Sequence, residues 1–469
     1  MSLPQLNRTN HGRPAAPIRL VHLGLGNFTR AHQAWYTEHA DDAEQWGIAA
    51  FTGRRPTMAE LLSPQDGLYT LITKGAAGDS FEVISSISVV HPAADYAQLI
   101  SYLASPDMAV VTSTVTEAGY YRAEDGGLDL ADPAVAADLA ALAELVAGGE
   151  LTVDRIAATP VATAPARILA GFLARRSAGV GALTILPCDN IPNNGQAFKR
   201  VIVEAAEQVD PSLSAWIEEQ ISWATCMVDR ITPATTEEDR AECEAQQGYL
   251  DAAPVPTEPF SEWVISGEFP AGRPRWESAG AQVVADVEPY EQRKLWMLNG
   301  SHSLMAYCAP ILGLETVGAA IEHPLVRDWV QQWWASAGPR LSVPWEEYAA
   351  ALTERYQNPN IRHLLAQIAH DGSQKIPVRI APVLIASARE GAPAPAAVRA
   401  LAGWLLHLRG VGAPVVDAQE AKVLELAAGT LEEAAAKVLA YAAPELAGDE
   451  SLTASLVQAA KELLALAEG

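Results

Sequence analysis

The segment that decides how this sequence is interpreted runs from Pro289 to Gly313 and reads PYEQRKLWMLNGSHSLMAYCAPILG. Three polar residues, Lys294, Asn299 and His302, stand in a run that is otherwise mostly apolar. At the pitch of an α-helix, His302 falls about 80° and Asn299 about 140° around the axis from Lys294. One helix could therefore direct an amine, an amide and an imidazole into one cleft. The plainer alternative is a helix with a solvent-reaching lysine and a hydrogen-bonded core histidine.

Length and charge restrict the class of protein. A chain of 469 residues is too long for one ordinary core, so two or three domains are expected. The composition is 49% hydrophobic and 19% charged, as in globular proteins, and the formal net charge is −25. Such a surface repels nucleic acid and anionic membranes, so neither is an expected partner. Small anionic substrates remain possible, because a local basic pocket can outweigh the mean field.

Cysteine usage and the N-terminus indicate a cytoplasmic protein. The four cysteines show neither a paired nor a metal-ligand spacing, so neither disulfides nor a metal site is expected. Residues 1–17 are polar and contain proline, which indicates a flexible leader rather than a signal peptide. No run of 18 or more apolar residues occurs, so no membrane span is expected.

The first elements predict a βαβ unit. A β-rich run at 18–23 leads through Gly24-x-Gly26 into an amphipathic helix, and a second strand follows at 47–52. Glycines there let the backbone approach a pyrophosphate, although a plain βα turn is an equally good interpretation. Arg54 and Arg55 replace the acidic residue that commonly binds the ribose of NAD. These arginines could accept the additional phosphate of NADP, or they could simply be solvated.

Further along the chain, polar residues follow two more predicted strands. The run 108–116 ends in Thr116 and Glu117, and the strand beginning near 181 ends at Asn190. Residues 68–91 predict a hairpin or additional strands, whereas 251–275 are rich in proline and indicate a long connection. From about 285 onward the sequence predicts helices, interrupted by a polar, loop-like stretch at 370–380. We expect an α/β Rossmann-like domain over 18–280 and a predominantly α-helical domain over 281–469.

A series of motifs in order resembles the mannitol dehydrogenase family of polyol-specific long-chain dehydrogenases. The resemblance spans about residues 18–380. It is carried by these segments: GLGNFTRAH, STVTEAGY, CDNIPNNG, MVDRITP, GRPRWESAGAQVVADVEP, KLWMLNGSH and DGSQKIP. The Lys-x4-Asn-x2-His pattern and the upstream VDR are the most specific of them. The resemblance implies a zinc-independent, NAD(P)-dependent secondary-alcohol dehydrogenase with a Rossmann-like domain.

Residue roles also follow from the resemblance. Lys294 would be the general acid/base, His302 would orient the substrate and Asp229 would support the lysine. Asn190 and Asn299 would donate hydrogen bonds to the developing alkoxide, as neutral donors in an oxyanion hole do. The expected cofactor-binding residues are Gly24, Gly26, Asn27, Phe28, Arg54, Thr116 and Glu117. Many relatives carry histidine where this chain has Thr29, so the cofactor site is expected to differ there.

Substrate and cofactor preference stay open at this stage. DGSQKIPVR is more similar to the mannonate/fructuronate branch, in which Lys375 or Arg379 would neutralise a uronate carboxylate. The expected reaction is therefore of the D-mannonate to D-fructuronate type. The alternative is a mannitol 2-dehydrogenase-type enzyme that acts on D-mannitol or D-arabinitol, with both basic residues bonded to hydroxyls or solvated. NAD is the expected cofactor, with NADP possible.

Two other classes of function are weaker. A nucleotide-binding protein without catalysis is opposed by the intact Lys294, Asn299 and His302. A metal-dependent sugar dehydrogenase or isomerase would need clustered ligands, which the ten histidines do not provide. The expected protein is a monomer or a small homo-oligomer.

Overall fold

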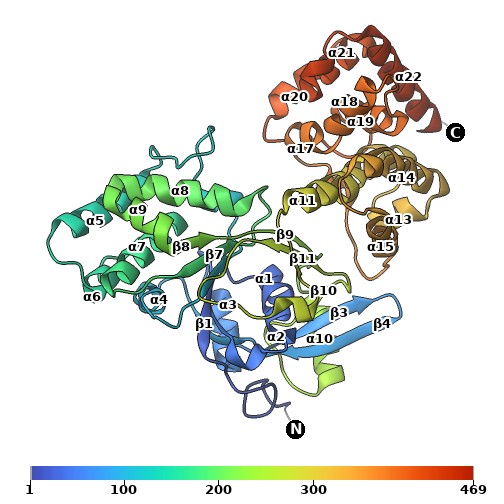
Figure 1. Ribbon diagram of the computed structural model, residues 1–469. Helices are drawn as coiled ribbons and strands as arrows, with labels where there is room; N and C mark the ends of the chain where they lie inside the picture. Colours follow the sequence, from blue (N-terminus) through green and yellow to red (C-terminus); the bar gives the residue numbers. More distant parts are fainter. Residues whose placement is uncertain (1–2, 468–469) are drawn as a thin grey trace. The chain divides into compact units, whose positions relative to one another are not determined.

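The computed structural model describes residues 3–467, which form two compact units that divide between Glu288 and Pro289. The first unit is built on a parallel sheet and the second consists of helices, apart from one isolated bridge between Thr316 and Leu364. Figure 1 shows both units with their elements labelled. The predicted fold class, a Rossmann-like α/β domain followed by a helical domain, is confirmed.

A six-stranded parallel sheet forms the centre of the first unit, in the order β5-β2-β1-β6-β7-β8. Its strands are β1 (Ile18–Leu23), β2 (Gly47–Phe51), β5 (Ile87–His91), β6 (Val110–Ser113), β7 (Leu183–Pro187) and β8 (Ile221–Trp223). The central strands are almost wholly buried, which explains their near-continuous apolar sequence. Because strand order reverses beside β1, the carboxyl ends of β1 and β6 lie where open α/β sheets bind ligands.

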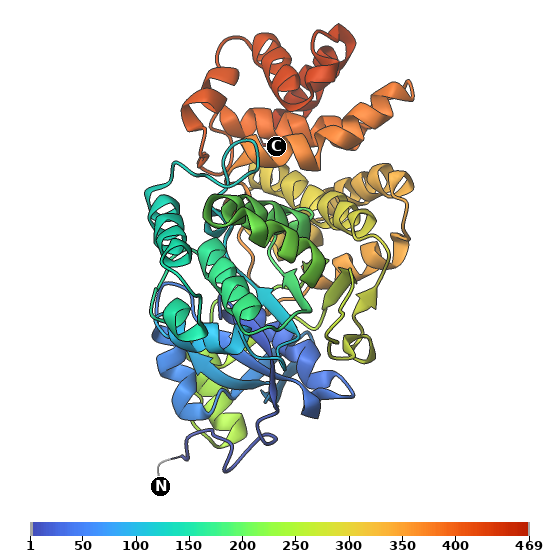
Figure 2. The same ribbon diagram turned by 60° about the vertical axis from the view of Figure 1, so that its left-hand side comes forward.

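Alternate residues of each strand face two separate cores. Val21 and Leu23 pack under the helices of residues 96–220, whereas Leu20 packs with α1 to α3. The first group is α4 (Tyr96–Leu103), α5 (Pro133–Ala147), α6 (Val153–Ala157), α7 (Ala164–Ser177), α8 (Asn194–Val209) and α9 (Pro211–Gln220). The second group is α1 (Asn27–Ala31), α2 (Gln33–His39) and α3 (Thr57–Leu62). Figure 2 shows the green and teal helices of the first group side by side.

Two small sheets complete this unit. The predicted hairpin exists as β3 (Tyr69–Gly75) and β4 (Gly78–Ile84), which pair with β10 rather than extend the central sheet. The other sheet has the order β12-β11-β9. Its members and β10 are β9 (Thr225–Asp229), β10 (Val255–Thr257), β11 (Glu262–Ser266) and β12 (Gln282–Val283). The expected long connection at 251–275 therefore contains two strands, because its prolines stand between and beside short apolar runs.

The second unit places α12 against several neighbouring helices. The elements used below are α11 (Glu288–Lys294), η5 (Leu295–Asn299), α12 (Gly300–Cys308), α14 (Pro324–Ala337), α15 (Glu346–Tyr356), α16 (Leu365–Ile368), α17 (Gly372–Arg379), α18 (Ala381–Arg389), α19 (Pro395–Leu408) and α22 (Glu450–Ala467). The loop-like interpretation of 370–380 was wrong, since most of it is helix α17 with Pro377 inside. Pro377 is the sixth of the eight residues of α17 and therefore removes one backbone donor from the helix.

Two further observations concern the part of the chain described. None of the helices within 3–467 is both long and apolar enough to cross a bilayer. All four cysteines are buried and free.

Candidate active site

The segment around Lys294 is not a regular α-helix. Residues Leu295–Asn299 form a turn of π-helix between α11 and α12, in which the N–H of Gly300 donates to the carbonyl of Leu295, five residues earlier. The expected separation of about 140° between Lys294 and Asn299 was therefore wrong. A π-turn is wider than an α-helical turn and rotates less per residue, which moves Asn299 toward the face that carries Lys294. Such turns are frequent at functional sites.

Side chains from other helices bind the carbonyls of this widened turn. The indole N–H groups of Trp333 and Trp334 on α14 donate to the carbonyls of Trp296 (2.7 Å) and Met297 (3.0 Å). The hydroxyl of Tyr356 donates to the carbonyl of Leu298 at 3.2 Å. All three donors are buried, so the turn is satisfied without water. These residues were missed from the sequence because they lie more than 35 positions away and carry no local signal.

His302 lies on α12 with its ring between two others. The Tyr356 ring packs against it at 5.0 Å and 32°, and the His363 ring meets it edge-on at 5.2 Å and 86°. Burial lowers the pKa of His363, which favours its neutral form. The two neighbours restrict the orientation of the His302 imidazole, as a substrate-orienting group requires.

The two basic residues of α17 differ in their contacts. The ammonium of Lys375 donates to the carbonyls of Ile368 (3.2 Å) and His370 (2.5 Å), at the end of α16. The guanidinium of Arg379 donates to Oγ of Ser303 at 3.3 Å, on the same helix as His302. Because α17 contacts both η5 and α12, Arg379 belongs to the same part of the unit as Asn299.

Arg379 has no acidic partner among the described residues. Burial lowers its pKa to about 10, and the only opposing charge effect comes from the Tyr307 hydroxyl. Burial also lowers the pKa of Lys375, and the nearby charge of Arg379 lowers it further. Arg379 is half-buried and makes this one hydrogen bond, so it lacks the counter-charge that a charge removed from water ordinarily has.

The glycine turn of the first unit has the shape that close backbone approach requires. Gly24 has φ +101°, and a Cβ there would lie 2.6 Å from the carbonyl oxygen of Thr114. A Cβ on Gly26 would meet only the Gly24 carbonyl, at 3.7 Å, so the space above it is open. The amide of Asn27 donates to the carbonyl of Pro233 at 3.2 Å, and Phe28 stacks on His32 with ring centres 5.0 Å apart.

Three more predicted cofactor residues lie at strand ends of the same sheet. Arg54 follows β2, and Thr116 and Glu117 follow β6; all three are exposed. Arg54 and Glu117 line a cavity of about 560 Å³ together with Tyr121 and Arg122. This cavity, with both signs of charge, and the open glycine turn both follow strands of the central sheet, which is where open α/β sheets bind dinucleotides.

Asn190 is exposed directly after a buried carboxyl group, Asp189. Ser113 and Tyr120 donate to Oδ2 of Asp189 at 2.8 and 2.6 Å, and burial raises its pKa to about 6. This network fixes the start of the loop that presents Asn190. Asp229 ends β9 and is 3% exposed.

The predicted residues thus form two sets. Lys294, Asn299, His302, Lys375 and Arg379 belong to the helical unit, around η5, α12 and α17. Asn190, Asp229 and the cofactor-binding residues belong to the first unit, and most lie at the carboxyl ends of the central strands.

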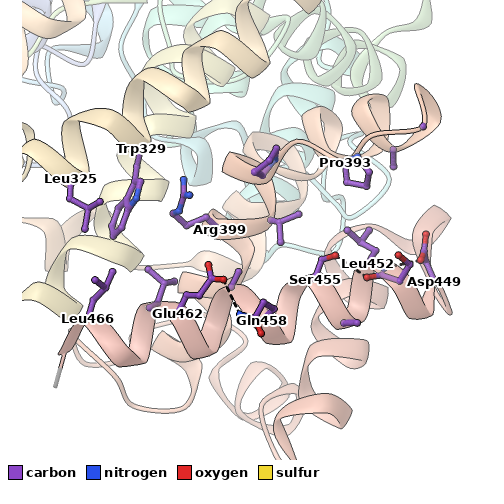
Figure 3. A pocket seen from close by; sticks show the side chains of 18 residues that line it. Leu325, Trp329, Pro393, Arg399, Asp449, Leu452, Ser455, Gln458, Glu462 and Leu466 are labelled. Carbon is purple, nitrogen blue, oxygen red and sulfur yellow. Dashed lines mark hydrogen bonds between the residues drawn. The ribbon is translucent and has the colours of Figure 1, made fainter. Parts of the chain in front are cut away.

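A larger cavity, of about 880 Å³, lies elsewhere in the helical unit. Figure 3 shows it between α14, the start of α19 and the length of α22, with Trp329, Arg399 and Glu462 on its walls. None of the predicted site residues lines it. Separately, the residues from 3 to 467 contain no group of three or more His, Cys, Asp or Glu side chains that could hold a metal ion.

Family models match both units of this chain. The mannitol dehydrogenase Rossmann domain matches residues 18–278, and the mannitol dehydrogenase C-terminal domain matches residues 286–464. The chain belongs to the mannitol dehydrogenase family. It is accordingly an oxidoreductase of the secondary-alcohol dehydrogenase type, as the sequence predicted.

Individual members of the mannitol dehydrogenase family are similar over most of the chain. D-mannonate oxidoreductase of Escherichia coli is 38% identical over 408 residues, which cover 84% of this chain and 80% of that protein. A substrate-free D-sorbitol dehydrogenase structure has a TM-score of 0.86 at 28% identity and covers 97% of this chain and 95% of its own. The ternary complex of Pseudomonas fluorescens mannitol 2-dehydrogenase with NAD and D-mannitol has a TM-score of 0.75 at 29% identity, covering 98% and 96%.

Proposed function

We propose that this protein is an NAD-dependent oxidoreductase acting on the secondary alcohol of a linear sugar acid, of the D-mannonate to D-fructuronate type. The observation that carries the substrate class is Arg379, a half-buried guanidinium with one hydrogen bond and no acidic partner among residues 3–467. A substrate carboxylate would supply the missing counter-charge through a charge-assisted, bidentate pair. The similarity to D-mannonate oxidoreductase supports the same class.

A carboxylate fits this position better than a phosphate does. Lys375, the nearest second cation, already donates to two backbone carbonyls, which leaves it fewer donors for a dianion. A monoanion matches the single available guanidinium. We therefore assign carboxylate binding principally to Arg379, while Lys375 holds the end of α16 and adds positive potential to the same region.

The proposed chemistry starts with removal of the hydroxyl proton. Nζ of Lys294 takes this proton as general base while hydride leaves the carbon that bears the hydroxyl group. In the reverse reaction Lys294 returns the proton as general acid. When bound, the dinucleotide would supply its nicotinamide ring as the hydride acceptor. As the C–H and O–H bonds break, the carbon–oxygen bond becomes a carbonyl, so atoms and charge balance.

The other residues act on the developing oxyanion and on substrate orientation. Asn190 and Asn299 donate amide hydrogen bonds to the alkoxide, and being neutral they stabilise it without competing for the proton of Lys294. His302, packed between Tyr356 and His363, orients the substrate. Asp229 is assigned support of the lysine.

The glycine turn and the strand-end residues are assigned to the dinucleotide. Gly24 and Gly26 would admit the pyrophosphate, with Asn27 and Phe28 shaping the turn. Arg54, Thr116 and Glu117 would hold the adenosine and ribose portions. We propose NAD over NADP because Arg54 shares its cavity with several carboxylates, among them Glu117, Asp129 and Asp132, which disfavour an additional phosphate.

A neutral polyol is the competing substrate, favoured by the similarity to mannitol 2-dehydrogenase. Steady-state rates with D-fructuronate and D-fructose, each with NADH and NADPH, separate the two. Our proposal predicts a higher kcat/KM for D-fructuronate with NADH. A preference for D-fructose would replace the sugar acid by a polyol, and a preference for NADPH would assign Arg54 to the 2′-phosphate.

A further inference from the structure

A buried imidazole lies directly beneath the glycine turn. His22 is on β1, where the parallel register pairs it with Thr112 on β6, and its ring is 1% exposed. Its Nδ1 lies 2.8 Å from Oγ of Thr112, and its Nε2 lies 2.7 Å from Oγ of Thr29. A second threonine, Thr114, lies 3.0 Å from the same Nε2.

The hydroxyl protons in this cluster have one consistent order. Oγ of Thr114 lies 2.9 Å from the carbonyl oxygen of Gly24, which can only accept, so Thr114 donates its proton there. Thr29, 2.6 Å from Thr114, must then donate to Thr114 and accept from His22. In this order His22 carries its proton on Nε2, and Nδ1 accepts from Thr112, whose alternative acceptor, the carbonyl oxygen of Val21, lies farther away at 3.5 Å. The result is a directed chain from strand β1 through α1 to the carbonyl of the turn.

Two features keep this series of hydrogen bonds in one arrangement. Burial lowers the pKa of His22 to about 3, so the ring stays neutral at ordinary pH. The next carbonyl of the turn, that of Gly26, accepts from Nε of Arg30 at 3.2 Å. Both glycine carbonyls are thus bonded on the inner side of the turn, and the peptide planes between them have little freedom to rotate.

We propose that His22, Thr29 and Thr114 are cofactor-positioning residues that fix the orientation of the glycine turn and thereby set the affinity for the dinucleotide. This proposal rests on the dinucleotide assignment of the proposed function. It also explains why Thr29 stands in the first turn of α1: a short hydroxyl can both donate to Thr114 and accept from His22 within the space that the buried ring leaves.

The first test is Thr29→Val in the full-length protein, which keeps the shape and removes the hydroxyl. NADH binding is measured by fluorescence titration, together with kcat at saturating NADH. We expect the dissociation constant to rise about fivefold, as loss of one buried hydrogen bond predicts, while kcat changes less than twofold. Thr114→Val should have at least as large an effect, because Thr114 contacts the turn directly.

Thr184→Val is the matched control. Thr184 is fully buried in the same sheet and donates to the carbonyl of Glu268 at 3.1 Å, so it loses a comparable bond that does not reach the glycine turn. Its dissociation constant for NADH should equal that of the wild type. If Thr29→Val and Thr184→Val bind NADH equally well, the network is purely structural and our proposal is wrong. Failure of the wild type to bind NADH or NADPH would instead overturn the dinucleotide assignment.

A spectroscopic test addresses the proton order itself. Long-range ¹H–¹⁵N correlation on uniformly labelled protein reports the tautomer of His22. We expect His22 to be the Nε2–H tautomer in the wild type, with no titration between pH 5 and 8. In Thr29→Val we expect His22 no longer to be held in that single tautomer. The Nδ1–H tautomer of His22 in the wild type would contradict the proposed order of hydrogen bonds.

Discussion

Nη1 of Arg379 lies 3.3 Å from Oγ of Ser303, the residue that follows His302 on α12. This hydrogen bond uses one of five guanidinium donors, and no carboxylate among the described residues pairs with the rest. The bond links a half-buried positive charge to helix α12, which carries His302 and begins directly after Asn299. Variants of Arg379 can therefore test substrate recognition separately from variants of Asn299 and Lys294, which test catalysis.

Arg379→Met should lower kcat/KM for D-fructuronate by about 10–100-fold, since a hydrogen-bonded ion pair is lost. The rate with D-fructose should change much less, because a neutral ketose has no carboxylate for Arg379 to bind. Steady-state kinetics with both substrates measure the difference. Equal losses for the two substrates would show that Arg379 supports the fold of α17 rather than binding a carboxylate.

Lys375→Met is the companion variant. Because its ammonium binds the carbonyls of Ile368 and His370, we expect Lys375→Met to lower the melting temperature and to lose less of the discrimination between the two substrates than Arg379→Met does. Thermal unfolding and the ratio of the two kcat/KM values report these effects. A larger loss of discrimination in Lys375→Met than in Arg379→Met would reverse the two roles.

Asn299→Ala should lower kcat by about 100-fold with little change in the dissociation constant of NADH, since it removes one donor to the developing alkoxide. Burst and steady-state kinetics measure the first quantity and fluorescence titration the second. A change confined to KM would instead make Asn299 a ground-state binding residue.

Trp333→Phe tests whether the π-turn matters. The substitution leaves the carbonyl of Trp296 without its indole donor in a buried site, at a cost of about 1–3 kcal/mol in unfolding free energy. If the turn then relaxes toward an α-helix, Asn299 moves away from Lys294 and kcat falls more than the stability loss explains. Trp263→Phe, in the first unit, provides the control for losing a buried tryptophan. An unchanged kcat in Trp333→Phe would show that the indole bond does not determine the catalytic geometry.

Acid should destabilise both units through buried imidazoles. Burial lowers the pKa of His22 to about 3 and that of His407 to about 4, against about 6.5 in an unfolded chain. Between about pH 6.5 and 4 the unfolded chain binds protons that the folded chain does not. The unfolding free energy therefore falls as pH falls, by up to about 1.4 kcal/mol per pH unit for each histidine. Urea unfolding at pH 7, 6 and 5 measures the unfolding free energy at each pH. This free energy should fall less steeply with falling pH in His407→Gln than in the wild type, and an equal fall in both proteins would contradict the prediction.

The sequence predicted much of this molecule because its signals were local. The strand 18–23, the glycine turn and the lysine segment are each contained within a few residues. The π-turn could not be predicted, because its carbonyls are satisfied by Trp333 and Trp334, which only the folded unit brings near. Helix α17 was mistaken for a loop because Gly372, Ser373 and Pro377 are typical of loops, whereas here the first two begin a helix that packs on α12 and Pro377 lies inside it. The role of His22 was hidden because its partners come from two other segments, Thr29 from one and Thr112 and Thr114 from the other.

The most direct test of the proposed mechanism is the turnover number of Lys294→Ala with D-fructuronate and NADH at saturation. If Lys294 is the acid/base, kcat at pH 7 should fall by about 10²–10⁴-fold while NADH still binds with wild-type affinity. The control is Lys199→Ala, which removes a surface lysine paired with Glu218 and should retain full activity. Lys294→Ala with wild-type turnover would contradict the mechanism.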